Sequence, residues 1–241
     1  MALRSLFFLQ MTTIRKDDSP VAEQLSFLRG IDSPTIANAI EKIHPRDRCE
    51  GYIGGSVRCM FPELGVMVGQ ALTVTMDSQP GSVADREGHW RMWEALLQLA
   101  RPSVVVVKDL SGAPSRCAYF GEVMASIAAA CGAVGVVTDG GLRDLAEVRA
   151  LGLHYFAPFP VVSHGNFRII DVGVPVVLDG QRVETGDLLH GDANGIVIVP
   201  AECVPQLPTA IDQIRRRERT ILDYVKRPGF NLGGLRDAGG Y

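Results

Sequence analysis

The stretch VVVVKDLSGAPSRCAYFGEVMASIAAACGAVGVVTDGGLRDLAEVRAL, residues 104–151, alternates two patterns and indicates the fold class. Two short runs rich in valine, VVVVK at its start and VGVVT at 134–138, are typical of strands buried on both faces of a parallel sheet. Residues 121–131 and 144–151 have the apolar spacing of helices, and a third short strand is expected at 154–160. This βαβαβ order predicts an α/β fold with a parallel core.

Further elements are expected on both sides of this core. Before it, the sequence predicts a helix at 33–43, a strand at 69–76 and a helix at 83–100. The predicted inner face of the helix at 83–100 contains Trp93, Leu96, Leu97 and Ala100. After it, VPVVLDGQRVETGDLLHGDANGIVIVP (174–200) alternates short strands with glycine turns, which is typical of antiparallel β structure. A helix at 207–225 follows, with an apolar stripe of Leu207, Ile211, Ile214, Ile221, Leu222 and Val225.

Composition and charge limit the class of protein. The chain has 241 residues, 46% of them hydrophobic, and a formal net charge of −3, which gives no general electrostatic reason to expect nucleic acid or an anionic membrane as a partner. The five cysteines are scattered and odd in number, as in a cytoplasmic protein with reduced thiols. No apolar run approaches the roughly 18 residues of a transmembrane helix. The apolar start, MALRSLFFLQM, is too short for a secretory signal and is interpreted as part of an N-terminal extension.

Chemically useful side chains cluster where the first two core strands end. Because ligands bind at the carboxyl ends of parallel strands, Glu122 and the pair Arg143–Asp144 are expected at one edge of the sheet. The helix start there offers an anion the backbone N–H groups of Glu122, Val123 and Met124. Arg143 adds a planar guanidinium suited to a carboxylate or oxyanion, and Asp144 an oxygen ligand for a hard divalent cation. Glu122 could orient a metal-bound water or act as an acid or base.

Structural interpretations of the same residues remain open at this point. An Arg–Asp pair at a helix start is commonly an N-cap beside a solvated arginine. A glutamate in the first turn, such as Glu122, commonly complements the helix dipole. The Asp139–Gly140–Gly141 sequence is also an ordinary tight turn. Spacing alone therefore leaves both a catalytic and a structural role for this cluster.

A family resemblance adds to this pattern. Gly121, the spacing of twenty residues between Glu122 and Arg143–Asp144, the run GVVTDGGLRD and the segment 174–200 together resemble the 4-hydroxy-4-methyl-2-oxoglutarate aldolases. That family also contains the regulator of ribonuclease activity A, RraA. The resemblance implies an RraA-like swivelling β/β/α domain at 33–200, with an antiparallel C-terminal β section. An N-terminal extension (1–32) would precede this domain, and a C-terminal helix and tail (201–241) would follow it.

The resemblance also implies roles for individual residues. Gly121, Glu122, Val123 and Met124 would form the helix start that binds a pyruvyl group, Arg143 would contact the substrate, and Asp144 would bind Mg²⁺ or Mn²⁺ directly. The family assembles as homotrimers or hexamers, with active sites between subunits. Glu218 is the candidate for an acid that a neighbour's C-terminal helix contributes. The sequence departs from the family at Asn38–Ala39, where relatives often have Asp-Ala, and in the segment 77–93.

The activity that the resemblance implies is that of a metal-dependent, class II pyruvate aldolase. Such a lyase would cleave a 4-hydroxy-2-oxo acid of the 4-hydroxy-4-methyl-2-oxoglutarate type to pyruvate through a metal-stabilised enolate, with oxaloacetate decarboxylation as a side activity. The alternative is a non-catalytic binding protein of the ribonuclease-regulator type, although those proteins typically lack the intact Arg–Asp pair. A nucleotide-binding protein is a third interpretation, but no G-x-G-x-x-G or G-x-x-x-x-G-K-[ST] motif occurs.

Two groups of residues are not expected to take part in the chemistry. Lys108, at the end of a predicted strand, is interpreted as structural rather than as a Schiff-base lysine. The histidines have no metal-ligand spacing and are all interpreted as surface or loop residues: His44, His89, His154, His164 and His190.

Overall fold

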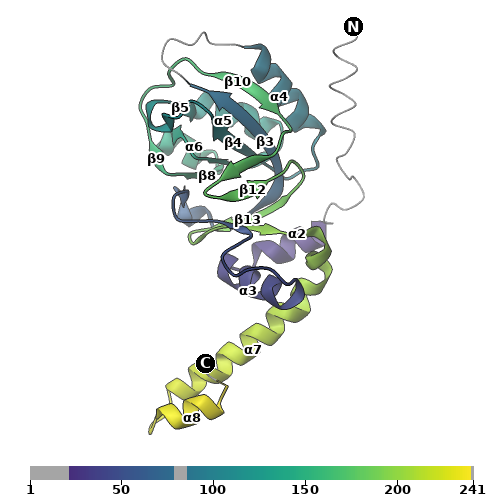
Figure 1. The fold of residues 1–241 in the computed structure, drawn as a ribbon, viewed down its shortest axis with the longest axis vertical. Coiled ribbons are helices and arrows are strands. Elements are labelled where there is room, and N and C mark those ends of the chain that lie inside the picture. Colours follow the sequence, from purple (N-terminus) through teal and green to yellow (C-terminus); the bar gives the residue numbers. More distant parts are fainter. Residues whose placement is uncertain (1–21, 79–85, 240–241) are drawn as a thin grey trace.

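The computed structural model describes residues 22–78 and 86–239. Most of the predicted N-terminal extension and the beginning of the helix predicted at 83–100 lie outside these residues. Figure 1 shows an α/β body with a helical arm that extends away from it and ends near the C-terminus. Within the described residues, no helix is long and apolar enough to cross a membrane.

A mixed sheet forms the centre of the body. Its four parallel strands are β3 (Met67–Asp77), β4 (Ser103–Asp109), β6 (Ala133–Thr138) and β8 (His154–Ala157). The order across the sheet is β1-β14-β13-β3-β4-β6-β8-β2, and β10 pairs with the C-terminal half of β3. The added strands are antiparallel: β1 (Tyr52–Ile53), β2 (Arg58–Cys59), β10 (Arg168–Val172), β13 (Leu188–Asp192) and β14 (Gly195–Val199). The parallel core and the antiparallel C-terminal section are therefore confirmed.

Two smaller sheets accompany the central one. A hairpin of β11 (Val176–Leu178) and β12 (Gln181–Val183) is antiparallel. A parallel three-stranded sheet consists of β5 (Ala118–Phe120), β7 (Gly141–Leu142) and β9 (Phe159–Pro160). The third parallel strand predicted at 154–160 is confirmed as β8, but it ends at Ala157, and the chain then enters β9 of the small sheet. Strands of two or three residues are too short to show a periodicity in the sequence.

Helices cover one face of the sheet and close one of its ends. They are α2 (Ala22–Arg29), α3 (Ser33–Ile43), α4 (Glu87–Gln98), α5 (Glu122–Ala130), α6 (Leu145–Ala150), α7 (Leu207–Val225) and α8 (Leu232–Asp237). Single 3₁₀ turns occur at Pro62–Leu64 and Pro114–Arg116, and a longer one at Ala201–Gln206 precedes α7. Figure 1 shows α4, α5 and α6 beside the sheet and α2, α3 and α7 at the opposite end of the body.

The valine run of β4 is buried on both faces, as predicted for a central parallel strand. Val105 and Val107 belong to the core shared with α4, α5 and α6. Val104 and Val106 point to the other face, where the β11–β12 hairpin covers them. Alternate side chains of a strand point to opposite faces, so four consecutive valines supply two cores at once. A third core joins α2, α3 and α7 to β13 and β14.

Several predicted side-chain positions are wrong. Leu97 was assigned to the inner face of α4 but is 56% exposed, while Met92 and Ala95 are buried in its place. The predicted apolar stripe of α7 is buried only in its first half, and Leu222 and Val225 are exposed. The described part of the predicted extension forms α2, which contributes Leu25 and Leu28 to the core.

Two histidines that were interpreted as surface or loop residues are buried strand residues: His154 in β8 and His190 in β13. His190 ties the helical end of the body to the sheet, since its Nε2 lies 3.0 Å from the Leu28 carbonyl oxygen and its Nδ1 lies 3.0 Å from Ser33 Oγ. A carbonyl oxygen only accepts, so Nε2 carries the proton and Nδ1 accepts from the Ser33 hydroxyl. Burial lowers the pKa of His190 below its ordinary value.

This burial predicts that the protein loses stability as the pH falls. A histidine with a lowered pKa in the folded state binds its proton more readily in the unfolded chain, so the free energy of unfolding should decrease below about pH 6.5, the ordinary pKa of histidine. Urea unfolding between pH 8 and pH 5 should show a smaller decrease for His190→Gln than for the wild type. The matched control is His44→Gln, at the end of α3 outside the core. Equal pH dependence in all three proteins would contradict this account.

Candidate active site

The small parallel sheet brings the two ends of the predicted motif together. After β4 and β6 the chain does not enter a helix directly but first adds β5 and β7 to the small sheet. In that sheet Phe120 pairs with Leu142, and the Arg143 amide donates to the Phe120 carbonyl oxygen at 2.9 Å. The residues that follow, Gly121 and Asp144, are therefore neighbours. The sequence correctly placed them at one edge but did not reveal the sheet that joins them.

Asp144 has an unusual backbone and an unusual partner. It precedes α6 with φ 54° and ψ 45°, in the left-handed region that residues other than glycine rarely adopt. Its side chain does not cap α6; instead Oδ2 accepts a hydrogen bond from the Glu122 amide at 2.8 Å, at the start of α5. The simple N-cap interpretation of the Arg–Asp pair therefore does not describe this residue. Left-handed backbone at a non-glycine residue costs about 1–3 kcal/mol and is concentrated at functional sites.

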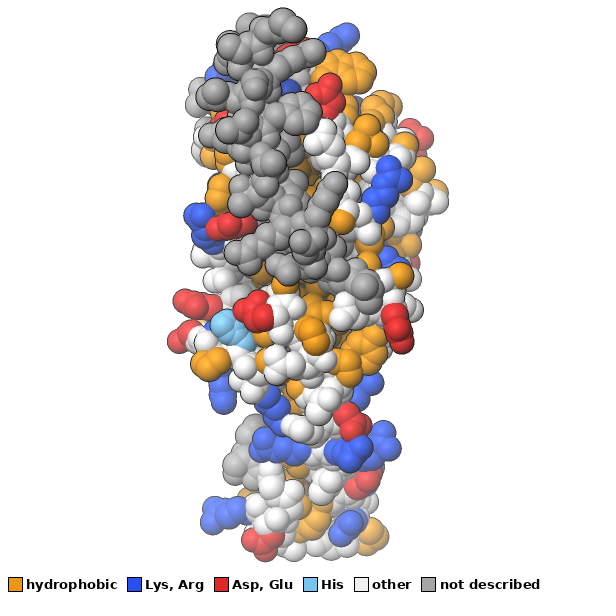
Figure 2. Space-filling view, turned by 90° about the vertical axis from the view of Figure 1, so that its right-hand side faces the viewer, with side chains coloured by type: hydrophobic (Ala, Val, Ile, Leu, Met, Phe, Trp, Pro, Cys, Tyr) orange, Lys and Arg blue, Asp and Glu red, His pale blue; other side chains and the backbone are white. Residues whose placement is uncertain are grey.

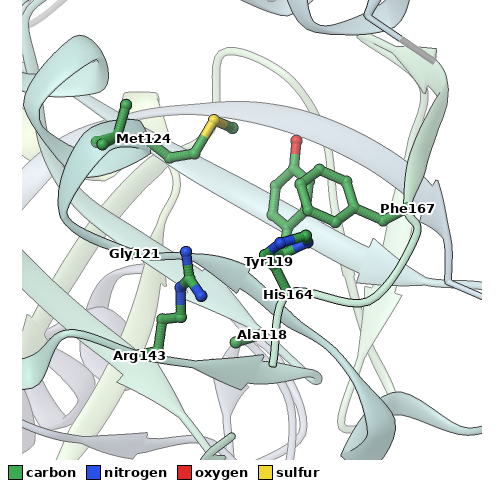
Figure 3. Close-up of a pocket in the computed structure, with 8 residues that line it drawn as sticks. Ala118, Tyr119, Gly121, Met124, Arg143, His164 and Phe167 are labelled. Atoms are coloured by element: carbon green, nitrogen blue, oxygen red, sulfur yellow. The ribbon is translucent and has the colours of Figure 1, made fainter. Parts of the chain in front are cut away.

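Arg143 lies over Gly121 and reaches the same cavity. Its Nε is 3.6 Å from Asp144 Oδ2, and both side chains are about one-third exposed. A Cβ atom added to Gly121 would lie 2.4 Å from Asp144 Oδ2 and 2.8 Å from Arg143 Nε. The Asp144 carboxylate and the Arg143 guanidinium can therefore occupy these positions only because Gly121 has no side chain. Figure 3 shows the Arg143 side chain extending from its strand end toward the cavity.

The start of α5 offers backbone donors beside these side chains. The first helical hydrogen bond of α5 runs from the Ala125 amide to the Gly121 carbonyl oxygen. The amides of Glu122, Val123 and Met124 therefore precede the hydrogen-bonding pattern of the helix. The Glu122 amide already binds a carboxylate oxygen, that of Asp144, which shows what this helix start attracts. The Glu122 side chain itself is exposed and does not line the cavity described next.

Gly121, Glu122, Arg143 and Asp144 form the junction between the starts of α5 and α6. A cavity of about 160 Å³ adjoins this junction (Figure 3). Its lining is largely apolar and consists of Ala118, Tyr119, Gly121, Val123, Met124, Arg143, His164 and Phe167. The rings of Tyr119 and Phe167 pack edge to face with centroids 4.8 Å apart. The Tyr119 hydroxyl points away and donates to the Met92 sulfur at 3.4 Å, and burial raises its pKa. Arg143 is thus the one lining residue with a permanent charge. No motif or spacing in the sequence indicated His164 or Phe167 as lining residues.

The junction fits a magnesium-like ion better than a zinc-like one. Within residues 22–78 and 86–239, no group of three or more His, Cys, Asp or Glu side chains could hold a metal, so a closed zinc site is not formed there. Mg²⁺ commonly binds one or two carboxylates, keeps several waters and takes further ligands from its substrate. Asp144 offers such a carboxylate, since only its Oδ2 is required for the contact with Glu122.

Two further predicted positions lie outside the junction. Lys108, at the end of β4, forms an ion pair with Asp139 at the end of β6, which supports its structural interpretation. Glu218 is on α7, where it borders an open groove of about 580 Å³ between α3 and α7. Figure 1 shows α7 far from α5 and α6. Within one chain Glu218 is not brought to the junction, so any role there requires a second chain.

Comparison with known proteins defines the family. The family model described as RraA-like, Aldolase/RraA, matches residues 34–198, which is more than half of the chain. The chain therefore belongs to the RraA-like family.

Individual relatives are more distant. A protein of Alkalilimnicola ehrlichii is 35% identical over 44% of this chain and 65% of its own length, and one of Halalkalibacterium halodurans is 31% identical over 42% and 48%. Both carry the name "Putative 4-hydroxy-4-methyl-2-oxoglutarate aldolase". The chain thus spans about half to two thirds of these relatives.

A solved structure shares the fold. The Streptomyces coelicolor protein described as an unusual member of the RNase ES inhibitor RraA family has a TM-score of 0.67 and 23% identity, covering 85% of this chain and 100% of that one. At this identity the likeness concerns the fold alone.

The crowding at Gly121 predicts a strong effect of a single methyl group. Gly121→Ala should push Asp144 away from the Glu122 amide and lower the free energy of unfolding by about 1–3 kcal/mol, the usual cost of overpacking. The matched control is Gly55→Ala, because a Cβ atom there would meet nothing within 4 Å, and this change should stay within about 0.5 kcal/mol. Urea unfolding compares the two variants. Equal effects would show that Gly121 does not hold this contact.

Proposed function

We propose that the chain is a divalent-metal-dependent lyase that cleaves a 4-hydroxy-2-oxo acid of the 4-hydroxy-4-methyl-2-oxoglutarate type to pyruvate. The observation that carries this proposal is the meeting of the Arg143 guanidinium, the Asp144 carboxylate and the first-turn amides of α5 beside one cavity. Membership of the RraA-like family and the aldolase names of its relatives support the same activity.

The start of α5 is suited to hold the carboxylate of the substrate. The amides of Val123 and Met124 and the positive end of the helix dipole form an anion site at the cavity wall. With the carboxylate there, the neighbouring keto oxygen comes under the Arg143 guanidinium. Arg143 donates to this oxygen in a fixed planar geometry, which orients the carbonyl before the reaction begins.

Cleavage places a negative charge on the former keto oxygen. When the bond between C3 and C4 breaks, its electron pair moves into the enolate of pyruvate, and the distal part leaves as a carbonyl compound. Arg143 stabilises the enolate oxygen, an interaction that strengthens as charge develops. A Mg²⁺ or Mn²⁺ ion on Asp144 would supply Lewis-acid polarisation of the same oxygen. Oxaloacetate decarboxylation passes through the same enolate and should therefore be a side activity.

The test is pyruvate release from a series of 4-hydroxy-2-oxo acids, measured with added Mg²⁺ or Mn²⁺. We expect turnover that disappears in excess EDTA and returns when the metal is restored. Asp144→Asn should need much more metal than the wild type, because it lacks the carboxylate charge. Full turnover in excess EDTA, with metal analysis showing no bound ion, would contradict the metal-dependent mechanism. A protein that binds oxalate but turns over none of the substrates would favour the non-catalytic, regulator-type alternative.

We further propose that the chain forms a homotrimer or a pair of trimers through its helical arm, the segment 215–239. Four large apolar side chains of this arm are exposed: Leu222, Val225, Phe230 and Leu232. Residues 207–241 contain seven basic and four acidic side chains, whereas the rest of the chain has a net charge of −6. Figure 2 shows basic and apolar side chains together on the lower, helical part of the molecule. A basic, apolar arm on an acidic body is suited to contact another copy, and it would carry Glu218 toward a neighbouring chain.

This assembly predicts that one charge on the arm disrupts it. Leu222→Arg should shift light scattering from a trimer or hexamer toward the monomer. Leu97→Arg, at a leucine of α4 with almost the same exposure (56% against 55%), is the matched control and should leave the assembly intact. A wild-type protein that is monomeric and fully active would contradict both the assembly and the role of Glu218.

A further inference from the structure

The cavity contains one imidazole, that of His164, on the loop between β9 and β10. This loop is held by two hydrogen bonds, one from the first residue of β5 and one from the residue just before it. The Ala118 amide donates to the Ser163 carbonyl oxygen at 2.8 Å, and the Cys117 thiol donates to the His164 carbonyl oxygen at 2.8 Å. The left-handed backbone that follows, with φ 54°, occurs at Gly165, where it costs little. The position of His164 is therefore defined by the fold even though its ring is exposed.

A hydrogen bond also defines which ring nitrogen of His164 is free. Its Nδ1 lies 2.6 Å from the Gly165 carbonyl oxygen. Because a carbonyl oxygen cannot donate, Nδ1 carries the proton, and the neutral ring keeps a lone pair on Nε2. A carbonyl partner on Nδ1 also holds the ring in one orientation and one tautomer. Figure 3 shows this ring beside Tyr119 and Phe167, at the same cavity as Arg143.

Cleavage of a 4-hydroxy-2-oxo acid requires a base for the distal hydroxyl. Among the side chains that line the cavity, five are apolar or absent, and Arg143 is permanently protonated. The hydroxyl of Tyr119 is buried against Met92 and faces away from the cavity. His164 is the remaining lining residue, and an imidazole is the side chain best suited to accept a proton near pH 7.

We infer that Nε2 of His164 is the general base that removes the proton from the 4-hydroxyl of the substrate, a role that rests on the proposed lyase function. The electron pair of the broken O–H bond forms the new carbonyl at C4. The bond between C3 and C4 breaks, and its electrons form the enolate that Arg143 stabilises. A water molecule protonates C3 of the enolate, which completes pyruvate, and the hydroxide left behind takes the proton from the imidazolium. Loss of the base should cost a factor of roughly 10²–10⁴ in rate.

Two reactions of one site test this role. His164→Gln should lower kcat for aldol cleavage by about 10²–10⁴-fold. Oxaloacetate decarboxylation, whose substrate has no 4-hydroxyl proton to remove, should change by less than about threefold. In His164→Ala, added imidazole should restore part of the cleavage rate. His44→Gln, outside the cavity, is the control for both reactions.

Binding of oxalate, a mimic of the enolate, separates loss of the base from loss of the site. The His164 variants should bind oxalate as the wild type does, measured by calorimetry in the presence of Mg²⁺. Cleavage that is unaffected by His164→Gln would overturn the inference, and so would an equal fall in cleavage and decarboxylation. A wild type that releases pyruvate from neither substrate would instead overturn the proposed lyase function, and the role of His164 with it.

Discussion

The hydrogen bond from the Glu122 amide to the Asp144 carboxylate is the contact on which the site depends. It joins the starts of two helices, with donor and acceptor 22 residues apart in the chain, and it holds Asp144 beside the first turn of α5. Two local conditions permit it: a left-handed backbone at Asp144 and no side chain at Gly121. A cap of this kind contributes typically about 1 kcal/mol, comparable to the lower range of the backbone strain. The rest of the free-energy cost of the strained backbone at Asp144 has to be offset by packing around this contact.

That packing comes from the two sheets together. The valines of β4 and β6 belong to two cores, so both strands are held by packing on both faces of the sheet. The small sheet then carries the chain from these ends to Gly121 and Arg143, with Phe120 and Leu142 fully buried beneath the junction. Arg143 therefore directly follows a paired strand, and its amide is hydrogen-bonded to the Phe120 carbonyl oxygen. Functional groups on rigid elements keep the geometry that stabilising a developing charge requires.

The sequence predicted the elements whose patterns are long enough to have a period. Four consecutive valines indicated β4, and regular apolar spacing indicated α3, α5 and α7. Motif spacing indicated Glu122, Arg143 and Asp144. Three features of the structure could not be predicted from the sequence, each for a physical reason. The strands of the small sheet are too short to show alternation. The burial of His154 and His190 depends on neighbouring strands or on hydrogen bonds to distant residues. His164 reaches the cavity only because of the path of its loop. Glu218 lies on α7 away from the junction, so the role that the resemblance implied for it would require a second chain.

The most direct test of the central claim is the kinetic effect of Arg143→Lys in a folded, metal-loaded protein. Lysine keeps the charge but loses the planar guanidinium, so the stabilisation of the enolate should fall more than substrate binding does. We predict that kcat for pyruvate release falls about 10²–10³-fold, the range for one oxyanion donor, while KM rises much less. A kcat within about twofold of the wild type would contradict the account, because surface substitutions commonly have such small effects.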